Sequence, residues 1–182
     1  MKLRLIPVAF MTLALTLLAS GAALADSATH TYQMEMEVPN VSEASNGDRI
    51  HMTGHAEFTV HPNAIVDGTG TFTHTNAGGT VLGSGSWTAT DLLDYQSYGC
   101  GEVLGNPFPP NLCGGKAKFR ILLMPAGTSA QVPAILTVFC IVGPNPPNSH
   151  DDPTGEGITL VVPGHENFNK IVSGMNIFIK IN

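Results

Sequence analysis

The sequence predicts an all-β fold in which about eight largely antiparallel strands form one domain. Apolar and polar residues alternate with a period of two along most of the chain after residue 29, which is typical of half-buried strands. No stretch repeats its apolar residues at helical spacing. The strands follow one another at hairpin spacing, as they do in antiparallel sheets. Eight such strands close into a β-barrel or pack as a β-sandwich, and we expect the barrel because that number of strands suits closure.

The first two predicted strands cover residues 32–38 and 50–61, with a turn between them at 40–48. In the strand at 50–61 the apolar residues and one glycine fall on every second position. Successive side chains of a strand point to opposite faces. We therefore expect the apolar face of this strand in the core and its polar face, which carries three histidines, toward solvent.

The next two strands form a predicted hairpin whose turn is the Asn-Ala-Gly-Gly sequence at 76–79. We expect Thr75 to face Thr80, a register that places Phe72 opposite Gly83. A glycine opposite an aromatic residue leaves bare backbone on which the ring can pack. Gly83 and Gly85 are therefore predicted to be packing or curvature sites for Phe72 and Trp87.

The rest of the chain continues the pattern of strands and loops. Two stretches read as loops, a Pro- and Gly-rich one at 101–112 and a polar one at 144–157. A strand at 92–98 is predicted to merge with the strand that carries Trp87, and the remaining strands are predicted at 116–123, 134–142, 158–162 and 175–181.

Residues 1–25 are predicted to be a cleavable secretory signal, which leaves 26–182 as a single all-β domain. Lys2 and Arg4 precede an apolar run, and Ala23-Leu24-Ala25 matches the small-x-small pattern at which signal peptidase cuts. The alternative is an uncleaved membrane anchor; polar residues directly after Ala25 favour cleavage. We therefore expect a secreted or periplasmic protein with no transmembrane segment after cleavage.

The charge of the chain excludes one class of partner. There are 14 acidic and 8 basic residues, for a formal net charge of −6, and two of the basic residues lie in the predicted signal. Nucleic-acid binding through a basic surface needs the opposite balance. We expect no nucleic-acid partner.

The three cysteines are expected in an oxidising compartment if the chain is exported. Cys100 and Cys113 bracket the loop at 101–112, and we predict a disulfide between them. Cys140 lies in an apolar strand, where a buried free thiol is expected. A bridge from Cys140 to either of the other cysteines, or to a cysteine of another molecule, is the alternative.

Two groups of residues are weak candidates for metal ligands. His55 and Glu57 share one face of the strand at 50–61, about 7 Å apart along the chain, and imidazole and carboxylate are common metal ligands. Asp151, Asp152 and Glu156 cluster in an acidic loop, but their spacing does not match the calcium-binding loop. A solvated polar surface is the simpler interpretation of both groups, so we predict no metal and no cofactor.

A ligand site is predicted in the interior of the barrel, lined by Phe72, His74, Trp87 and Phe119. His74 falls on the apolar face of its strand, and one polar group among apolar side chains is a common way to orient a ligand. A core histidine whose ring nitrogens are paired within the protein is the competing interpretation.

The surface offers a second kind of partner. Threonines recur at every second position from Thr69 to Thr75, a hydroxyl-rich face that fits a surface glycan, although threonine is also simply a good strand residue. Lys116, Lys118 and Arg120 alternate along one strand and are expected to pair with acidic residues across the sheet.

The sequence contains no recognisable catalytic motif, so whether the protein is an enzyme stays open, with a non-catalytic role favoured. We expect an exported binding module that holds a small apolar ligand in its barrel interior. The alternatives are a structural or envelope-interaction protein without a small ligand, and a barrel enzyme of the isomerase or cyclase type.

Overall fold

The computed structural model describes residues 28–103, 105–145 and 155–182, and in these ranges it contains strands and no helix. The predicted signal at 1–25 lies outside the described residues, as do Asp151 and Asp152. The ten strands are β1 (His30–Ala44), β2 (Arg49–Val60), β3 (Ala64–Thr75), β4 (Val81–Cys100), β5 (Glu102–Val103), β6 (Asn106–Pro107), β7 (Leu112–Pro125), β8 (Val132–Cys140), β9 (Gly157–Val161) and β10 (Asn167–Lys180).

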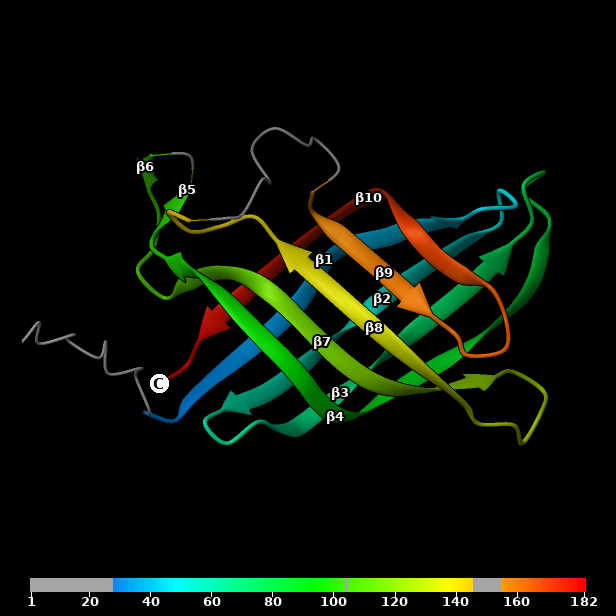
Figure 1. Cartoon of the computed structure of the whole chain (residues 1–182), viewed down its shortest axis with the longest axis horizontal. Helices are drawn as coiled ribbons and strands as arrows, with labels where there is room; N and C mark the ends of the chain where they lie inside the picture. The colour runs from blue at the N-terminus through cyan, green and yellow to red at the C-terminus, as the bar shows by residue number, and fades with distance from the viewer. Residues whose placement is uncertain (1–27, 104, 146–154) are drawn as a thin grey trace, which may run out of the picture.

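Eight of these strands form one antiparallel sheet that closes on itself in a ring, in the order β1-β10-β9-β8-β7-β4-β3-β2. The short β5 and β6 pair separately, within the predicted cysteine loop. Figure 1 shows the turns β1–β2, β3–β4, β7–β8 and β9–β10 together at one end of the ring, and the C-terminus with the β5–β6 hairpin at the other. The prediction of an all-β, antiparallel fold with about eight strands is confirmed.

The interior of the ring is filled by side chains from every long strand. Trp87, Phe58, Phe119 and Phe178 are completely buried. The ring of Phe58 meets that of Phe119 at 5.5 Å and that of Phe178 at 6.1 Å, both edge to face, a favourable geometry for aromatic pairs. The predicted faces of β2 are confirmed, since its apolar residues alternate into this core.

The β3–β4 register differs from the predicted one by one residue at Thr75 and by two residues from His74 back to Thr69. Thr75 pairs with Val81 beside a β-bulge, and Phe72 faces Gly85 rather than Gly83. The turn explains the difference, because it is closed between Asn76 and Thr80: the N–H of Asn76 donates to the carbonyl oxygen of Thr80, and the side-chain carbonyl of Asn76 accepts hydrogen bonds from the N–H groups of Gly78 and Thr80. A shift of two residues keeps each side chain on its predicted face.

Trp87, in β4, packs on glycines of β2 and β3 and not on the glycines of β4 itself. A methyl group added at Gly70 would lie 2.5 Å from Trp87 Nε1, and one added at Gly54 would overlap the indole ring. A methyl group at Gly83 would meet no atom within 4 Å. The predicted packing role is therefore wrong for Gly83. Gly85 has this role for Phe72, since an added methyl group would lie 2.9 Å from the phenyl ring, and Gly54 and Gly70 have it for Trp87.

Strand β10 begins eight residues before its predicted start at 175, and it changes partners along its length. Its first residues pair with β9, and Phe178 and Ile179 pair with β7. Where the pairing changes, the buried amide of Asn176 donates to the carbonyl oxygens of Phe139 and Gly157, both at 3.0 Å. Asn176 and the buried Asn40 of β1 also exchange two amide hydrogen bonds. These amides satisfy backbone groups that the ladder leaves unpaired.

Candidate functional site

An apolar pocket opens at the end of the ring where the β9–β10 turn lies. Its volume is about 210 Å³. The strands that meet there contribute inward-facing side chains from the residues near their ends. The pocket therefore continues the apolar core to the end of the ring. We call this the end pocket; it is lined by Ile50, Phe72, His74, Leu123, Pro125, Val132, Leu160, Val162, His165, Glu166 and Phe168.

His74 is the polar residue of the end pocket that the sequence predicted. Its Nε2 lies 3.1 Å from Oδ2 of Asp48, in the β1–β2 turn. Its ring meets the ring of Phe168 edge to face, at 5.4 Å. The side chain of His74 is 28% exposed and that of Asp48 is 14% exposed. The carboxylate fixes the orientation of the imidazole ring, and the histidine is therefore both paired within the protein and present at the pocket.

His165 and Glu166 form a polar rim to the end pocket, and sequence reasoning missed them as site residues. Both lie in the turn between β9 and β10, and Oε1 of Glu166 accepts a hydrogen bond of 2.7 Å from the side-chain amide of Asn46. Nothing in the local sequence marks them, because the turn reaches the pocket only when the ring closes.

Trp87 and Phe119 lie elsewhere in the molecule than Phe72 and His74. Both are fully buried in the core, and neither lines the end pocket. The indole N–H of Trp87 donates to the carbonyl oxygen of Thr53 at 2.9 Å, so the polar atom of this side chain is already paired. Of the four predicted ligand residues, the structure brings Phe72 and His74 together at one opening.

The metal candidates that the structure describes, His55, Glu57 and Glu156, do not come together. His55 contacts Asp67 of β3 at 3.3 Å, and Glu57 pairs with Asp67 in the sheet register, all on the outer surface. Glu156 accepts a hydrogen bond of 2.6 Å from the backbone N–H of Asn176. Burial raises the pKa of Glu156 above its ordinary value. In the part of the chain that the structure describes, no three His, Cys, Asp or Glu residues are grouped as metal ligands would be.

The predicted hydroxyl-rich face lies on the outside of β2, β3 and β4. Thr71 stands between Thr53 and Ser86 in the register, and the hydroxyls of Thr53 and Thr71 are 2.8 Å apart.

On the outside of β7, Arg120 pairs with Asp91 at 3.3 Å and Lys116 with Asp94 at 3.8 Å. The expected pairing of these basic residues across the sheet is confirmed for Arg120 and Lys116.

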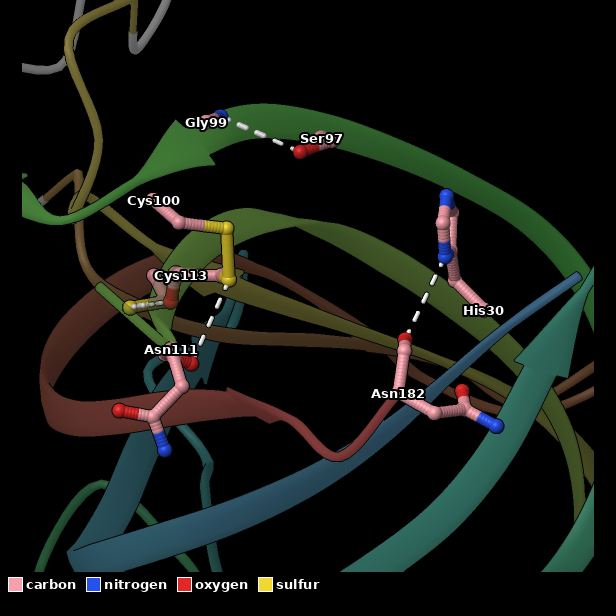
Figure 2. Close-up of a disulfide and its surroundings, with 8 residues drawn as sticks. His30, Ser97, Gly99, Cys100, Asn111, Cys113 and Asn182 are labelled. Carbon is pink, nitrogen blue, oxygen red and sulfur yellow. Dashed lines mark hydrogen bonds between the residues drawn. A yellow bond between two sulfur atoms is a disulfide. The ribbon is translucent and has the colours of Figure 1, made fainter. Parts of the chain in front are cut away.

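The predicted disulfide between Cys100 and Cys113 is confirmed. Figure 2 shows it joining the end of β4 to the start of β7, where the two cysteines are partners in the ladder. Cys140 is a free, buried thiol that donates a hydrogen bond to the carbonyl oxygen of Cys113 at 3.6 Å. Burial raises the pKa of Cys140 to about 12, which leaves it in its unreactive thiol form.

Two other hollows are more polar than the end pocket. One, of about 510 Å³, lies at the opposite end of the ring beside Tyr32, Tyr95 and Lys180. The other, of about 970 Å³, runs along the β9–β10 turn beside Glu43 and Lys170. An apolar ligand is therefore best matched by the end pocket, where apolar side chains form most of the lining.

Across residues 28–103, 105–145 and 155–182, no helix is long and apolar enough to cross a membrane. Comparison of the chain with protein-family models, with curated proteins and with solved structures gave no match. Its function is therefore inferred from its own residues and their geometry.

Proposed function

We propose that this chain is an exported binding protein whose end pocket holds the apolar part of a small ligand. The observation that carries the proposal is an apolar pocket of about 210 Å³ with one oriented histidine in its wall. A cavity of about 150 Å³ lined by aliphatic and aromatic side chains is large enough for benzene. The end pocket therefore has room for a small ring or a short alkyl group.

The packing of the ring supports a site at its end and not in its middle. Trp87, Phe58 and Phe119 are completely buried and fill the interior. A ligand there would have to displace aromatic side chains, at a cost of several kcal/mol for each lost core residue. The packed core instead forms a rigid inner wall of the end pocket, and a rigid wall lowers the conformational entropy lost on binding.

Export is supported by two independent features. Residues 1–25 have the pattern of a cleavable signal, and the Cys100–Cys113 disulfide fits an oxidising compartment. A carrier in such a compartment would take its ligand from outside the cytoplasm.

The test uses n-octanol as the probe and isothermal titration calorimetry as the assay. We expect a dissociation constant of about 0.1 to 1 mM, because a ligand of this size makes few contacts. Val132→Phe places a ring in the end pocket and should reduce affinity at least about tenfold. Val66→Phe makes the same change at a site on β3 that is 59% exposed and outside the pocket, and it should bind n-octanol as the wild type does.

Equal binding by the wild type and Val132→Phe would contradict a site in the end pocket. Native mass spectrometry of the mature protein from its own source gives an independent check, since a bound ligand adds mass that is lost on denaturation. A chain that binds no apolar probe and carries no ligand would favour the structural alternative, for which a packed interior is also expected. Turnover abolished by His74→Ala in a folded protein would favour the enzyme alternative.

A further inference from the structure

The end pocket is continuous with a polar groove on the outside of the β9–β10 turn. His165 and Glu166 line both hollows. We define the polar groove as residues 43–45 at the end of β1 together with 164–167, 169 and 170. A ligand whose apolar end fills the pocket would therefore carry any further part of its structure over the turn and into the groove.

The carboxylates of the polar groove are already hydrogen-bonded within the protein. Glu43 receives hydrogen bonds from Lys170 at 2.8 Å and from Arg49 at 2.9 Å. These donors hold the pKa of Glu43 below its ordinary value. Glu166 is held by the amide of Asn46 at 2.7 Å. An anionic head group would meet the carboxylates of Glu43 and Glu166 and the net negative charge of the chain, and a cationic one would meet Lys170.

The groove also carries uncharged polar groups for which the described part of the chain provides no partner. Among the described residues, the side-chain amides of Asn167 and Asn169 and the hydroxyl of Ser45 form no hydrogen bond with another protein group. An amide offers donors and acceptors together, as a hydroxyl does. Such groups match the hydroxyls of a sugar or polyol, which also donate and accept.

We propose that the ligand is an amphiphile with an uncharged sugar or polyol head group, whose apolar end occupies the end pocket while its head lies in the polar groove. This inference rests on the proposed function, because it takes the end pocket as the site of the apolar group. It goes further in naming the second half of the ligand and the residues that bind it, Asn167 and Asn169.

Four compounds with the same alkyl chain test the head group: octyl glucoside, n-octanol, nonanoate and octyltrimethylammonium, each titrated by calorimetry below its micelle concentration. We expect octyl glucoside to bind about 3- to 10-fold more tightly than n-octanol, which corresponds to one net hydrogen bond. The two charged compounds should bind no more tightly than n-octanol. Excess n-octanol should displace octyl glucoside, because both alkyl chains use the end pocket.

The double variant Asn167→Ala/Asn169→Ala removes the proposed contacts to the head group and leaves the site of the alkyl chain intact. It should bring the affinity for octyl glucoside to within about twofold of that for n-octanol and leave the affinity for n-octanol unchanged. Asn63→Ala, an exposed asparagine at the opposite end of the ring, is the matched control and should change neither affinity.

The outcomes distinguish the two proposals. If octyl glucoside binds no more tightly than n-octanol, or if the double variant weakens both equally, the head-group inference is overturned while the end pocket stands. If a charged compound binds most tightly, the head group has been assigned to the wrong class. If none of the four compounds binds, or if Val132→Phe binds n-octanol as the wild type does, the proposed function itself fails.

Discussion

The packing of Trp87 on Gly70 makes a strong prediction about stability. In Gly70→Ala the new methyl group would overlap the carbonyl oxygen of Thr53 and lie 2.5 Å from Trp87 Nε1. Gly70 has a backbone conformation that alanine can adopt, since it is not among the residues with positive φ. The effect of the substitution is therefore steric and not a matter of backbone strain.

Its magnitude follows from two costs. Overpacking a tightly packed core costs about 1–3 kcal/mol. Displacement of the indole also weakens its hydrogen bond of 2.9 Å to Thr53, worth about 1 kcal/mol. We expect Gly70→Ala to lower the free energy of unfolding by about 2–4 kcal/mol, a large part of the 5–15 kcal/mol typical of a domain.

Urea denaturation measures this change directly. Trp87 is the single tryptophan of the chain, so its fluorescence reports exposure of the core, and circular dichroism follows the strands in parallel. With a slope of about 2 kcal/mol per molar urea, the midpoint should fall by about 1–2 M.

Gly83→Ala is the matched control. It lies in the adjacent strand, and the added methyl group would meet no atom within 4 Å. Alanine is preferred to glycine in a strand by about 0.5–1 kcal/mol, so stability should be unchanged or slightly raised. If Gly83→Ala lost as much stability as Gly70→Ala, or if Gly70→Ala stayed within about 0.5 kcal/mol of the wild type, the packing argument would be refuted.

Three further predictions concern buried polar groups. Cys140 should resist a thiol reagent such as dithionitrobenzoate in the folded protein and react once denaturant exposes it, because its pKa is raised to about 12; rapid reaction in the native state would contradict its burial. Glu156 has a raised pKa, so its folded form holds its proton more tightly and its contribution to stability falls as pH rises from below about 4.5. Glu156→Gln should flatten that part of the stability profile in urea titrations; an unaltered slope would refute the assignment. Asn176→Ala should cost about 2–4 kcal/mol in thermal or urea unfolding, since buried carbonyl oxygens lose their donor, whereas the exposed Asn169→Ala should change stability by less than about 0.5 kcal/mol; equal costs would contradict a specific role for the buried amide.

The features that the sequence alone predicted are those that local patterns encode. The alternation along 50–61 predicted which face of β2 is buried, because side-chain direction in a strand depends on nothing beyond the strand itself. The disulfide was predicted because Cys100 and Cys113 flank a loop short enough to bring them together. The candidate site was predicted in part, since Phe72 and His74 lie on the inward face of one strand.

Long-range features required the tertiary structure. The β3–β4 register depends on how Asn76 shapes the turn, and a shift of two residues leaves every face unchanged, so alternation could not distinguish the two registers. The partners of Trp87 lie on β2 and β3, more than fifteen residues away in sequence. His165 and Glu166 joined the site only through ring closure, which brings the β9–β10 turn to the opening.

The presence of most strands, the direction of their faces and the disulfide were thus determined by the sequence, because each depends on residues close together in the chain. The position of the end pocket, its polar rim and the filling of the ring interior were decided by the tertiary structure. The physical reason is closure: which side chains meet in the middle of the ring, and which are left at its end, depends on the register of all eight strands together.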